Sequence, residues 1–307
     1  MIGHLVRAVW LHSVSSLKTA LRSSGSAYRT NNRYAVTVVS PPGYMHSAAF
    51  TEMAETIHYA LQSLGHDSVI TSDCALADRT HIVLGSNLLP TYPLTLADDA
   101  ILYNLEQVDV ASTWLRPQLI TIFRRHVLWD YSKRNAVAFE AMGVKVAHVV
   151  PVGYVKELTR IQRAPDTDID VLFFGSMNPR RQKIIDDMRA AGLRVEVIFG
   201  VYGARRDALI SRAKLVLNVH YYEAKVLEIV RLSYLLANSC AILSERSADS
   251  TEDDTFAGGV AFADYDHLVQ RACALIDAPD ERKHLAQRGF EIMSARPAQD
   301  YLRAALT

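Results

Sequence analysis

The sequence has few cysteines, no excess charge of either sign and no long hydrophobic run. The three cysteines, Cys74, Cys240 and Cys273, lack metal-ligand spacing, and their odd number predicts reduced thiols in a cytoplasmic protein. Lysine and arginine together number 33, as do aspartate and glutamate, so a nucleic-acid partner has no overall electrostatic support. Because no apolar run approaches the ~18 to 20 residues of a spanning helix, we expect no integral membrane segment.

We do not expect the first 32 residues to be a secretory signal. Their short apolar part contains an arginine, and no clear small-residue cleavage site follows it. Leu5, Val9, Leu17 and Leu21 fall near one face if this segment is helical. We interpret residues 1–32 as an N-terminal extension, and we favour a surface helix over reversible contact with the inner face of a membrane.

Two common phosphate-binding fingerprints are also missing. The turn GSMNPRR at residues 175–181 does not end in the Gly-Lys-Ser/Thr of a Walker loop. It also lacks the three glycines of the dinucleotide fingerprint, which removes the usual evidence for hydride transfer. The chain shows no internal repeat and no low-complexity segment. Neither fingerprint is therefore the basis of a nucleotide site in this chain.

Short apolar runs alternate with helix-period segments along most of the chain. In residues 169–245, VLFFG, VEVIFG, LVLNVHYY and CAILSE are apolar runs of this kind. Continuous apolar strands separated by single helices predict a parallel sheet covered on both faces, so the expected class is α/β and doubly wound. At 307 residues, two such domains are expected. We assign an N-terminal domain at 33–155, a linker at 156–168, a C-terminal domain at 169–295, and a final helix at 296–307 that packs back towards the first domain.

The N-terminal half predicts polar side chains at strand ends. Residues 34–40 form an apolar strand that runs into PPGYMHS, which places His46 above the carboxyl end of the strand. A helix is expected at 48–64. Later strands end at Glu106 and Asp130, and both carboxylates are expected to face the same cleft.

The turn after residue 174 is the first candidate nucleotide site in the C-terminal half. Gly175 and Ser176 end the strand, and Asn178 precedes a helix. Backbone amides at that helix start, with Arg180 and Arg181, favour a diphosphate. The alternative interpretation is that one or both arginines are solvated charges at a helix start.

Two further strand ends extend this candidate site. FGVYGARRD places Tyr202 in a glycine-containing loop that can approach a base or phosphate. The next strand delivers His220 to its end, and a helix is expected at 224–237. There, Lys225 is assigned to a phosphate and Glu228 to the ribose hydroxyls; the alternative is that Glu228 pairs only with Arg231. Residues 246–254 are expected to form an exposed loop.

With these residues placed, the chain resembles glycosyltransferases of the GT-B architecture. The resemblance rests on GSMNPRR, on ISRAKLVLNVHYYEAKVLEIVR, and on SYLLANSCAILSE before GGVAFADYDHLV. It implies two facing Rossmann-like domains, with a nucleotide-diphosphate sugar bound mostly by the second domain as substrate, and neither a cofactor nor a metal. It also implies that His46 is the general base, with Glu106 and Asp130 as competing candidates. Many retaining members carry two glutamates eight positions apart, whereas Glu228 is followed eight positions later by leucine, so a retaining mechanism lacks support.

The function expected from this resemblance is sugar transfer to a carbohydrate, lipid-linked or protein acceptor, in the synthesis of a surface polysaccharide or glycoconjugate. Two alternatives stay open at this point. The first is a nucleotide-sugar epimerase of the same fold, and the second is a non-catalytic nucleotide-binding module. A binding module needs a cleft but no base, so a histidine converging with the arginines and Glu228 distinguishes an enzyme from it.

Overall fold

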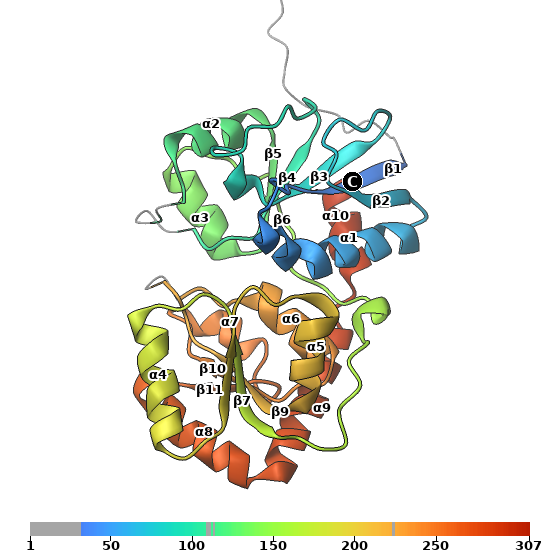
Figure 1. The fold of residues 1–307 in the computed structure, drawn as a ribbon. Coiled ribbons are helices and arrows are strands. Elements are labelled where there is room, and N and C mark those ends of the chain that lie inside the picture. Colours follow the sequence, from blue (N-terminus) through green and yellow to red (C-terminus); the bar gives the residue numbers. More distant parts are fainter. Residues whose placement is uncertain (1–31, 109–111, 113, 223–224) are drawn as a thin grey trace, which may run out of the picture.

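The computed structural model describes residues 32–108, 112, 114–222 and 225–307. The amphipathic helix expected near the N-terminus falls on residues 1–31, outside these ranges. The described chain folds into two α/β domains that lie one above the other in Figure 1. None of the described helices combines the length and the apolar character needed to cross a bilayer.

The N-terminal domain is built on a parallel sheet. Among the described residues, six strands are arranged in the order β2-β1-β3-β4-β5-β6. The strands are β1 Arg33–Val38, β2 Asp67–Thr71, β3 Thr80–Leu84, β4 Ile101–Asn104, β5 Val127–Asp130 and β6 His148–Val149. The helical segments are η1 Met45–Phe50, α1 Thr51–Ser63, η2 Ser86–Leu88, α2 Pro117–Arg125, α3 Lys133–Ala141 and η3 Lys156–Leu158.

The C-terminal domain repeats this architecture with another strand order. Its described strands, all parallel, are arranged as β11-β10-β9-β7-β8. The strands are β7 Ile169–Phe174, β8 Val195–Ile198, β9 Ala213–Asn218, β10 Ile242–Glu245 and β11 Ala261–Ala263. The helical segments of this domain are α4 Pro179–Ala190, α5 Gly203–Arg212, α6 Ile229–Ala237, α7 Ser250–Asp254, η4 Tyr265–His267, α8 Leu268–Asp277 and α9 Pro279–Ser294. The last helix, α10 Ala298–Leu306, packs on the N-terminal domain.

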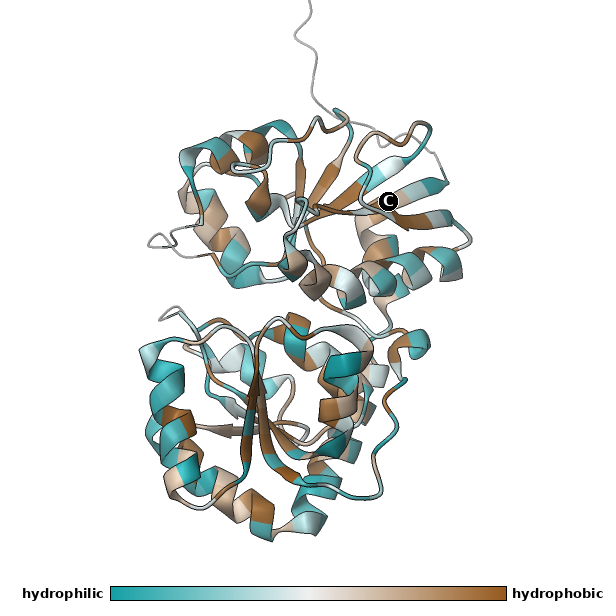
Figure 2. Cartoon of the chain, viewed as in Figure 1, coloured by the Kyte–Doolittle hydropathy of each residue, from teal (hydrophilic) through white to brown (hydrophobic). Residues whose placement is uncertain are grey.

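The apolar runs of the sequence form the centres of both sheets. Strands such as β3 are buried along their whole length, and the strands at the centre of the sheets appear mostly brown in Figure 2 while many helix surfaces are teal. Helices cover both faces of each sheet, as the continuous apolar character of the strands requires. The α/β class expected from the sequence is therefore confirmed.

The chain passes between the two domains twice at one side of the molecule. Near Tyr154 it leaves the N-terminal domain, and near Pro297 it returns, with the two segments joined by backbone hydrogen bonds of 2.8 and 2.9 Å. Gly153 permits this contact because a Cβ there would lie 2.4 Å from Cα of Ala298. Helix α10 then lies beside α1 in Figure 1. Its Leu302 belongs to the same core as Leu61 of α1.

Three local expectations differ from the structure. The helix expected at 224–237 begins only at Ile229. Residues 225–228 are irregular, and Lys225 has a φ of 45°, which a right-handed helix does not allow. The loop expected at 246–254 contains α7, and Glu252 of that helix accepts a hydrogen bond from Ser132 of the other domain. The strand expected at 34–40 ends at Val38, before the two prolines.

Candidate active site between the two domains

A cavity of about 590 Å³ lies between the domains, where the carboxyl ends of both sheets meet. Parallel strands expose loops and polar end residues at this edge, which is where ligands of such sheets bind. The N-terminal domain contributes the segment after β1 and the segment after β4. The C-terminal domain contributes the turns after β7 and β8 and the start of α6. Seven of the residues proposed from the sequence line the cavity: His46, Glu106, Gly175, Ser176, Arg181, Tyr202 and Glu228.

Glu228 occupies the N-cap position of α6 and carries a firmly ionised carboxylate. Nδ2 of Asn218, at the end of β9, donates to Oε2 of Glu228 at 2.8 Å. Nδ1 of His220 lies 3.0 Å from the same oxygen. Burial alone would raise the pKa of Glu228, but the His220 contact, the charge of Arg231 and the Asn218 hydrogen bond outweigh it and lower the pKa to about 2. The carboxylate is therefore a fixed hydrogen-bond acceptor at neutral pH.

Arg181 and Arg231 place two guanidinium groups beside this carboxylate. Arg181 comes from the first turn of α4, where Asn178 caps the helix and accepts from its backbone N–H at 2.9 Å. Its side chain donates to the carbonyls of Val219 and Ser176, both at 2.8 Å. Burial, followed by the like charge of Arg231, lowers the pKa of Arg181 to about 10, so it remains a cation at neutral pH.

Arg231 was considered in the sequence only as a possible partner of Glu228. In the structure its Nη1 donates to Oδ1 of Asn218 at 2.9 Å, and its guanidinium faces the cavity. Asn218 therefore holds Arg231 with its carbonyl oxygen and Glu228 with its amide nitrogen. Two arginines against one glutamate leave one excess positive charge at this end of the cavity, which suits an anionic ligand.

Gly175 keeps space open for Arg231. Its φ is +141°, and a Cβ added there would lie 2.9 Å from Nη2 of Arg231. Only glycine combines that backbone conformation with so close a side chain. Glycine at the end of β7 is therefore needed for the position of Arg231 in the cationic end of the cavity, which is formed by Arg181 and Arg231.

We expect Gly175→Ala to lower the Tm by roughly 2–4 °C through backbone strain, and to weaken nucleoside diphosphate binding by displacing Arg231. Gly192→Ala is the matched control, since Gly192 also has a positive φ, +88°, but nothing within 4 Å of an added Cβ. Thermal unfolding and calorimetric titration with UDP measure the two effects. Wild-type affinity in Gly175→Ala would show that the shape of this turn does not matter for binding.

His46 lies in η1, on the N-terminal side of the cavity, and reaches the opposite domain. Its Nδ1 is 2.8 Å from the hydroxyl of Tyr202, which precedes α5. Its ring lies 4.8 Å from that of Phe199, centroid to centroid. The histidine expected above the first strand is thus part of the cavity and is fixed by C-terminal side chains.

Glu106 also lines the cavity. The residue as a whole is half-buried, and Nδ2 of Asn87 donates to Oε1 of Glu106 at 3.5 Å. Burial raises the pKa of Glu106. Glu106 is therefore a second group on the N-terminal side that can exchange a proton.

Asp130, the third candidate base, is fully buried and does not line the cavity. Asn104 and Asn135 donate to its two oxygens at 2.7 and 3.0 Å, and the backbone N–H of Ser132 donates at 2.8 Å. Burial, partly opposed by these hydrogen bonds, raises the pKa of Asp130 to about 7. Its geometry corrects the expectation that it faces the cleft: it connects β4, β5 and the start of α3.

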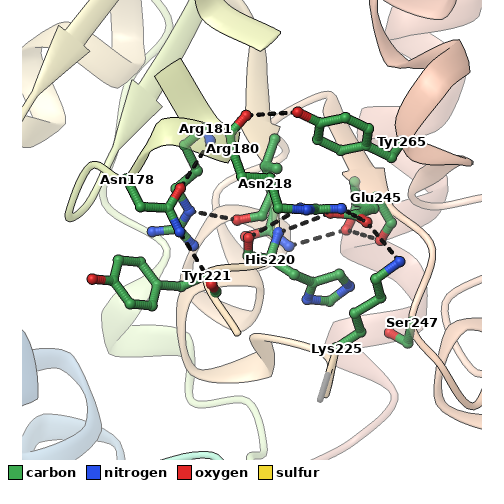
Figure 3. A network of polar contacts seen from close by, with 12 residues as sticks. Asn178, Arg180, Arg181, Asn218, His220, Tyr221, Lys225, Glu245, Ser247 and Tyr265 are labelled. Carbon is green, nitrogen blue, oxygen red and sulfur yellow. Dashed lines mark hydrogen bonds and ion pairs between the residues drawn. The ribbon is translucent and has the colours of Figure 1, made fainter. Parts of the chain in front are cut away.

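Four predicted donor-site residues also lie away from the cavity: Asn178, Arg180, His220 and Lys225. Figure 3 shows two of them around a carboxylate that the sequence analysis did not single out, Glu245. Arg180 forms a bidentate pair with Glu245, one hydrogen bond measuring 2.6 Å, and stacks on Tyr265 at 4.0 Å. Nζ of Lys225 lies 3.3 Å from the same carboxylate.

These contacts explain why two of the predicted phosphate ligands are engaged elsewhere. The side chain of Glu245 is only 1% exposed, and a buried carboxylate requires compensating cations. Arg180 and Lys225 supply them. Asn178 acts as a helix cap and also donates to the carbonyl of Tyr221 at 3.1 Å. In the described part of the chain, no three histidine, cysteine, aspartate or glutamate side chains are grouped so that they could hold a metal ion.

No protein-family model matches the chain. Among curated proteins, one uncharacterized protein of Acanthamoeba polyphaga mimivirus is 38% identical over 120 residues, which are 38% of this chain and 14% of that protein. A second from the same virus is 26% identical over 200 residues, 62% of this chain and 64% of that protein. The chain therefore spans less than two thirds of the length of these relatives.

Solved structures resemble the chain over most of its length. HepE from Anabaena, in complex with UDP and glucose, matches with a TM-score of 0.58 and 11% identity, over 89% of this chain and 97% of that chain. WaaG, a glycosyltransferase involved in lipopolysaccharide biosynthesis, matches with a TM-score of 0.54 and 12% identity, over 89% and 98%. At these identities the likeness concerns the fold. The expected GT-B fold, with two Rossmann-like domains facing across a cleft, is confirmed.

Proposed function

We propose that this protein transfers a sugar from a nucleotide-diphosphate sugar to an acceptor hydroxyl. The observation that carries the proposal is that one cavity between two domains joins a cationic end, an ionised glutamate and a histidine. The first two belong to the C-terminal domain and the histidine to the N-terminal domain. A site that only binds a nucleotide needs no base on the opposite wall.

The donor is assigned to the C-terminal wall. Arg181 and Arg231 bind the diphosphate, because guanidinium groups pair with phosphate oxygens in a bidentate manner. Glu228 accepts hydrogen bonds from the ribose hydroxyls, a role for which its low pKa suits it. In the transition state the same arginines stabilise the charge that develops on the departing diphosphate.

The acceptor is assigned to the N-terminal wall, with His46 as general base. The histidine takes the proton of the acceptor hydroxyl, the acceptor oxygen bonds to the anomeric carbon, and the bond from that carbon to the diphosphate breaks with its electron pair leaving on the nucleotide. Exposed rings border the cavity on both walls: Tyr44 on the N-terminal wall, and Phe199 and Tyr221 opposite it on the C-terminal wall. Apolar faces with polar rims suit a carbohydrate or lipid-linked acceptor.

The pathway proposed is synthesis of a surface polysaccharide or another glycoconjugate. It is supported by the likeness of the fold to WaaG, which is described as involved in lipopolysaccharide biosynthesis. The likeness to HepE bound to UDP and glucose makes a uridine nucleotide the first donor to try. The three free cysteines favour a cytoplasmic reaction.

Release of nucleoside diphosphate from a panel of nucleotide sugars, with and without glycan and lipid-linked acceptors, tests the proposal. We expect acceptor-dependent release with one donor class and a product heavier by one sugar in mass spectrometry. Isomerised donor without acceptor would instead indicate an epimerase. Nucleotide binding with no release from any donor would indicate a binding module.

We expect Glu228→Gln to weaken binding of UDP about tenfold, because a charged hydrogen-bond acceptor for the ribose is replaced by a neutral one. Comparing the affinities for UDP and 2′-deoxy-UDP tests the ribose contact itself, because the second ligand lacks one ribose hydroxyl. Wild type should prefer UDP, and the variant should lose that preference. The exposed Glu196 of β8 provides the control Glu196→Gln. An unchanged preference in Glu228→Gln would show that another group binds the ribose.

A further inference from the structure

His46 is held in place by side chains from the opposite domain. Its Nδ1 is 2.8 Å from the hydroxyl oxygen of Tyr202, and the ring of Phe199 lies beside it at 4.8 Å. Tyr44, from its own loop, meets the ring edge-on at 5.3 Å. The histidine is thus enclosed by three aromatic rings, of which two belong to the C-terminal domain. Its orientation depends on the contact between the domains.

A hydrogen bond to Nδ1 determines what the other ring nitrogen can do. If Nδ1–H donates to the tyrosine oxygen, the neutral ring keeps its lone pair on Nε2 and can accept a proton there. If the tyrosine donates to Nδ1, the proton lies on Nε2, and this nitrogen is no longer a base. The geometry alone allows both tautomers, but only the first is compatible with His46 removing a proton through Nε2.

We propose that Tyr202 is a positioning residue that holds His46 in the tautomer with Nδ1 protonated and Nε2 free to act as the base. This inference rests on the proposed transferase function. When the acceptor O–H bond breaks, the proton moves to Nε2, while Nδ1–H continues to donate to Tyr202 and supports the resulting imidazolium. Oxygen-to-carbon bond formation and loss of the nucleoside diphosphate complete the step, so no other reactant is needed.

The inference changes the role first assigned to Tyr202, which was binding of the donor. It also means that the base is assembled only when the two domains are in contact, since His46 and Tyr202 lie on opposite walls. Burial raises the pKa of Tyr202, so its hydroxyl keeps its proton, and a neutral hydroxyl oxygen can both accept from Nδ1–H and donate. A deprotonation step is therefore coupled to the closed arrangement of the domains.

Tyr202→Phe tests the proposal because it removes one oxygen and keeps the ring. We expect kcat to fall about tenfold, the effect of one hydrogen bond, with the Kd for UDP changed less than twofold. In a His46→Gln background, the same substitution should have no further effect on kcat, because the group it positions is gone. Tyr92, half-buried outside the cavity, supplies the control Tyr92→Phe.

Long-range 1H–15N spectra of the histidine ring test the tautomer independently of turnover. We expect wild-type His46 with its proton on Nδ1, and Tyr202→Phe with a shift towards the Nε2–H form. Wild-type His46 with its proton on Nε2, or equal loss of kcat from Tyr202→Phe with and without His46, would overturn the proposal. Failure of wild type to transfer any sugar would refute the proposed function instead, and the spectra would still decide the tautomer.

Discussion

Arg231→Met is expected to weaken UDP binding about 100-fold, because each hydrogen bond from a guanidinium to a phosphate contributes roughly 1.5–3 kcal/mol. Methionine fills a similar volume but lacks the charge. The free protein should lose little stability, since among the described residues Arg231 lies near Glu228 without forming an ion pair with it, and its side-chain hydrogen bond goes to Asn218. Isothermal titration calorimetry gives the affinity, and thermal unfolding gives the stability of the free protein.

Two other arginine substitutions separate a binding effect from a structural one. Arg205, exposed on α5, should bind UDP normally as Arg205→Met. Arg180→Met should lower the Tm of the free protein markedly, because it leaves the buried Glu245 without its bidentate partner. Equal UDP affinity in Arg231→Met and Arg205→Met would contradict the assignment of the diphosphate to this end of the cavity.

His46→Gln is expected to reduce sugar transfer by about 10²- to 10⁴-fold, the usual contribution of a general base. Glutamine keeps the polarity of the loop but cannot take up the proton. UDP should bind with nearly wild-type affinity, since the donor is held by the other domain. Steady-state kinetics and calorimetry distinguish the two effects.

Glu106→Gln decides between the two bases that line the cavity. If His46 is the base, Glu106→Gln should reduce kcat far less than His46→Gln does. The reverse order would assign the base to Glu106, whose raised pKa also suits proton transfer. Wild-type turnover in His46→Gln would remove this histidine from the mechanism altogether.

The sequence predicts the fold well because burial leaves a strong pattern. Runs such as VLFF and CAIL are apolar at every position, as the strands of a sheet covered on both faces require. Element boundaries are less accurate. Helix α6 was expected from residue 224, because the apolar residues Val226 and Leu227 continue its helical pattern. The helix begins only at Ile229, and the two residues are buried in an irregular segment before it.

The candidate site is less predictable, because strand ends fix where a residue lies but not the direction of its side chain. His46 and Glu228 end up in the cavity, whereas Asp130 turns into the sheet and is enclosed by Asn104 and Asn135. His220 is fully buried and supports Glu228 from behind. The alternation of side chains along a strand could have predicted these directions only if the exact end of the strand were known.

The partners of the charged side chains are equally hard to predict from the sequence, as three arginines show. The sequence presents Arg180 and Arg181 as an equivalent pair, but they are neighbours on a helix and point to different partners. Arg180 neutralises Glu245, 65 residues away along the chain, and Arg181 faces the cavity. Long-range pairing of this kind leaves no local signal. Arg231 could have been found, since an arginine in an otherwise apolar helix start requires a partner or a ligand.

Thermal unfolding of the wild type with UDP, GDP, ADP, CMP, dTDP and NAD tests the central claim most directly. A ligand at 100 times its Kd adds about 2.7 kcal/mol of stability, which a shift in Tm reports. The account predicts a shift with at least one nucleoside diphosphate that is lost in Arg231→Met. No shift with any diphosphate, or a shift with NAD alone, would contradict a nucleotide-sugar site in this cavity.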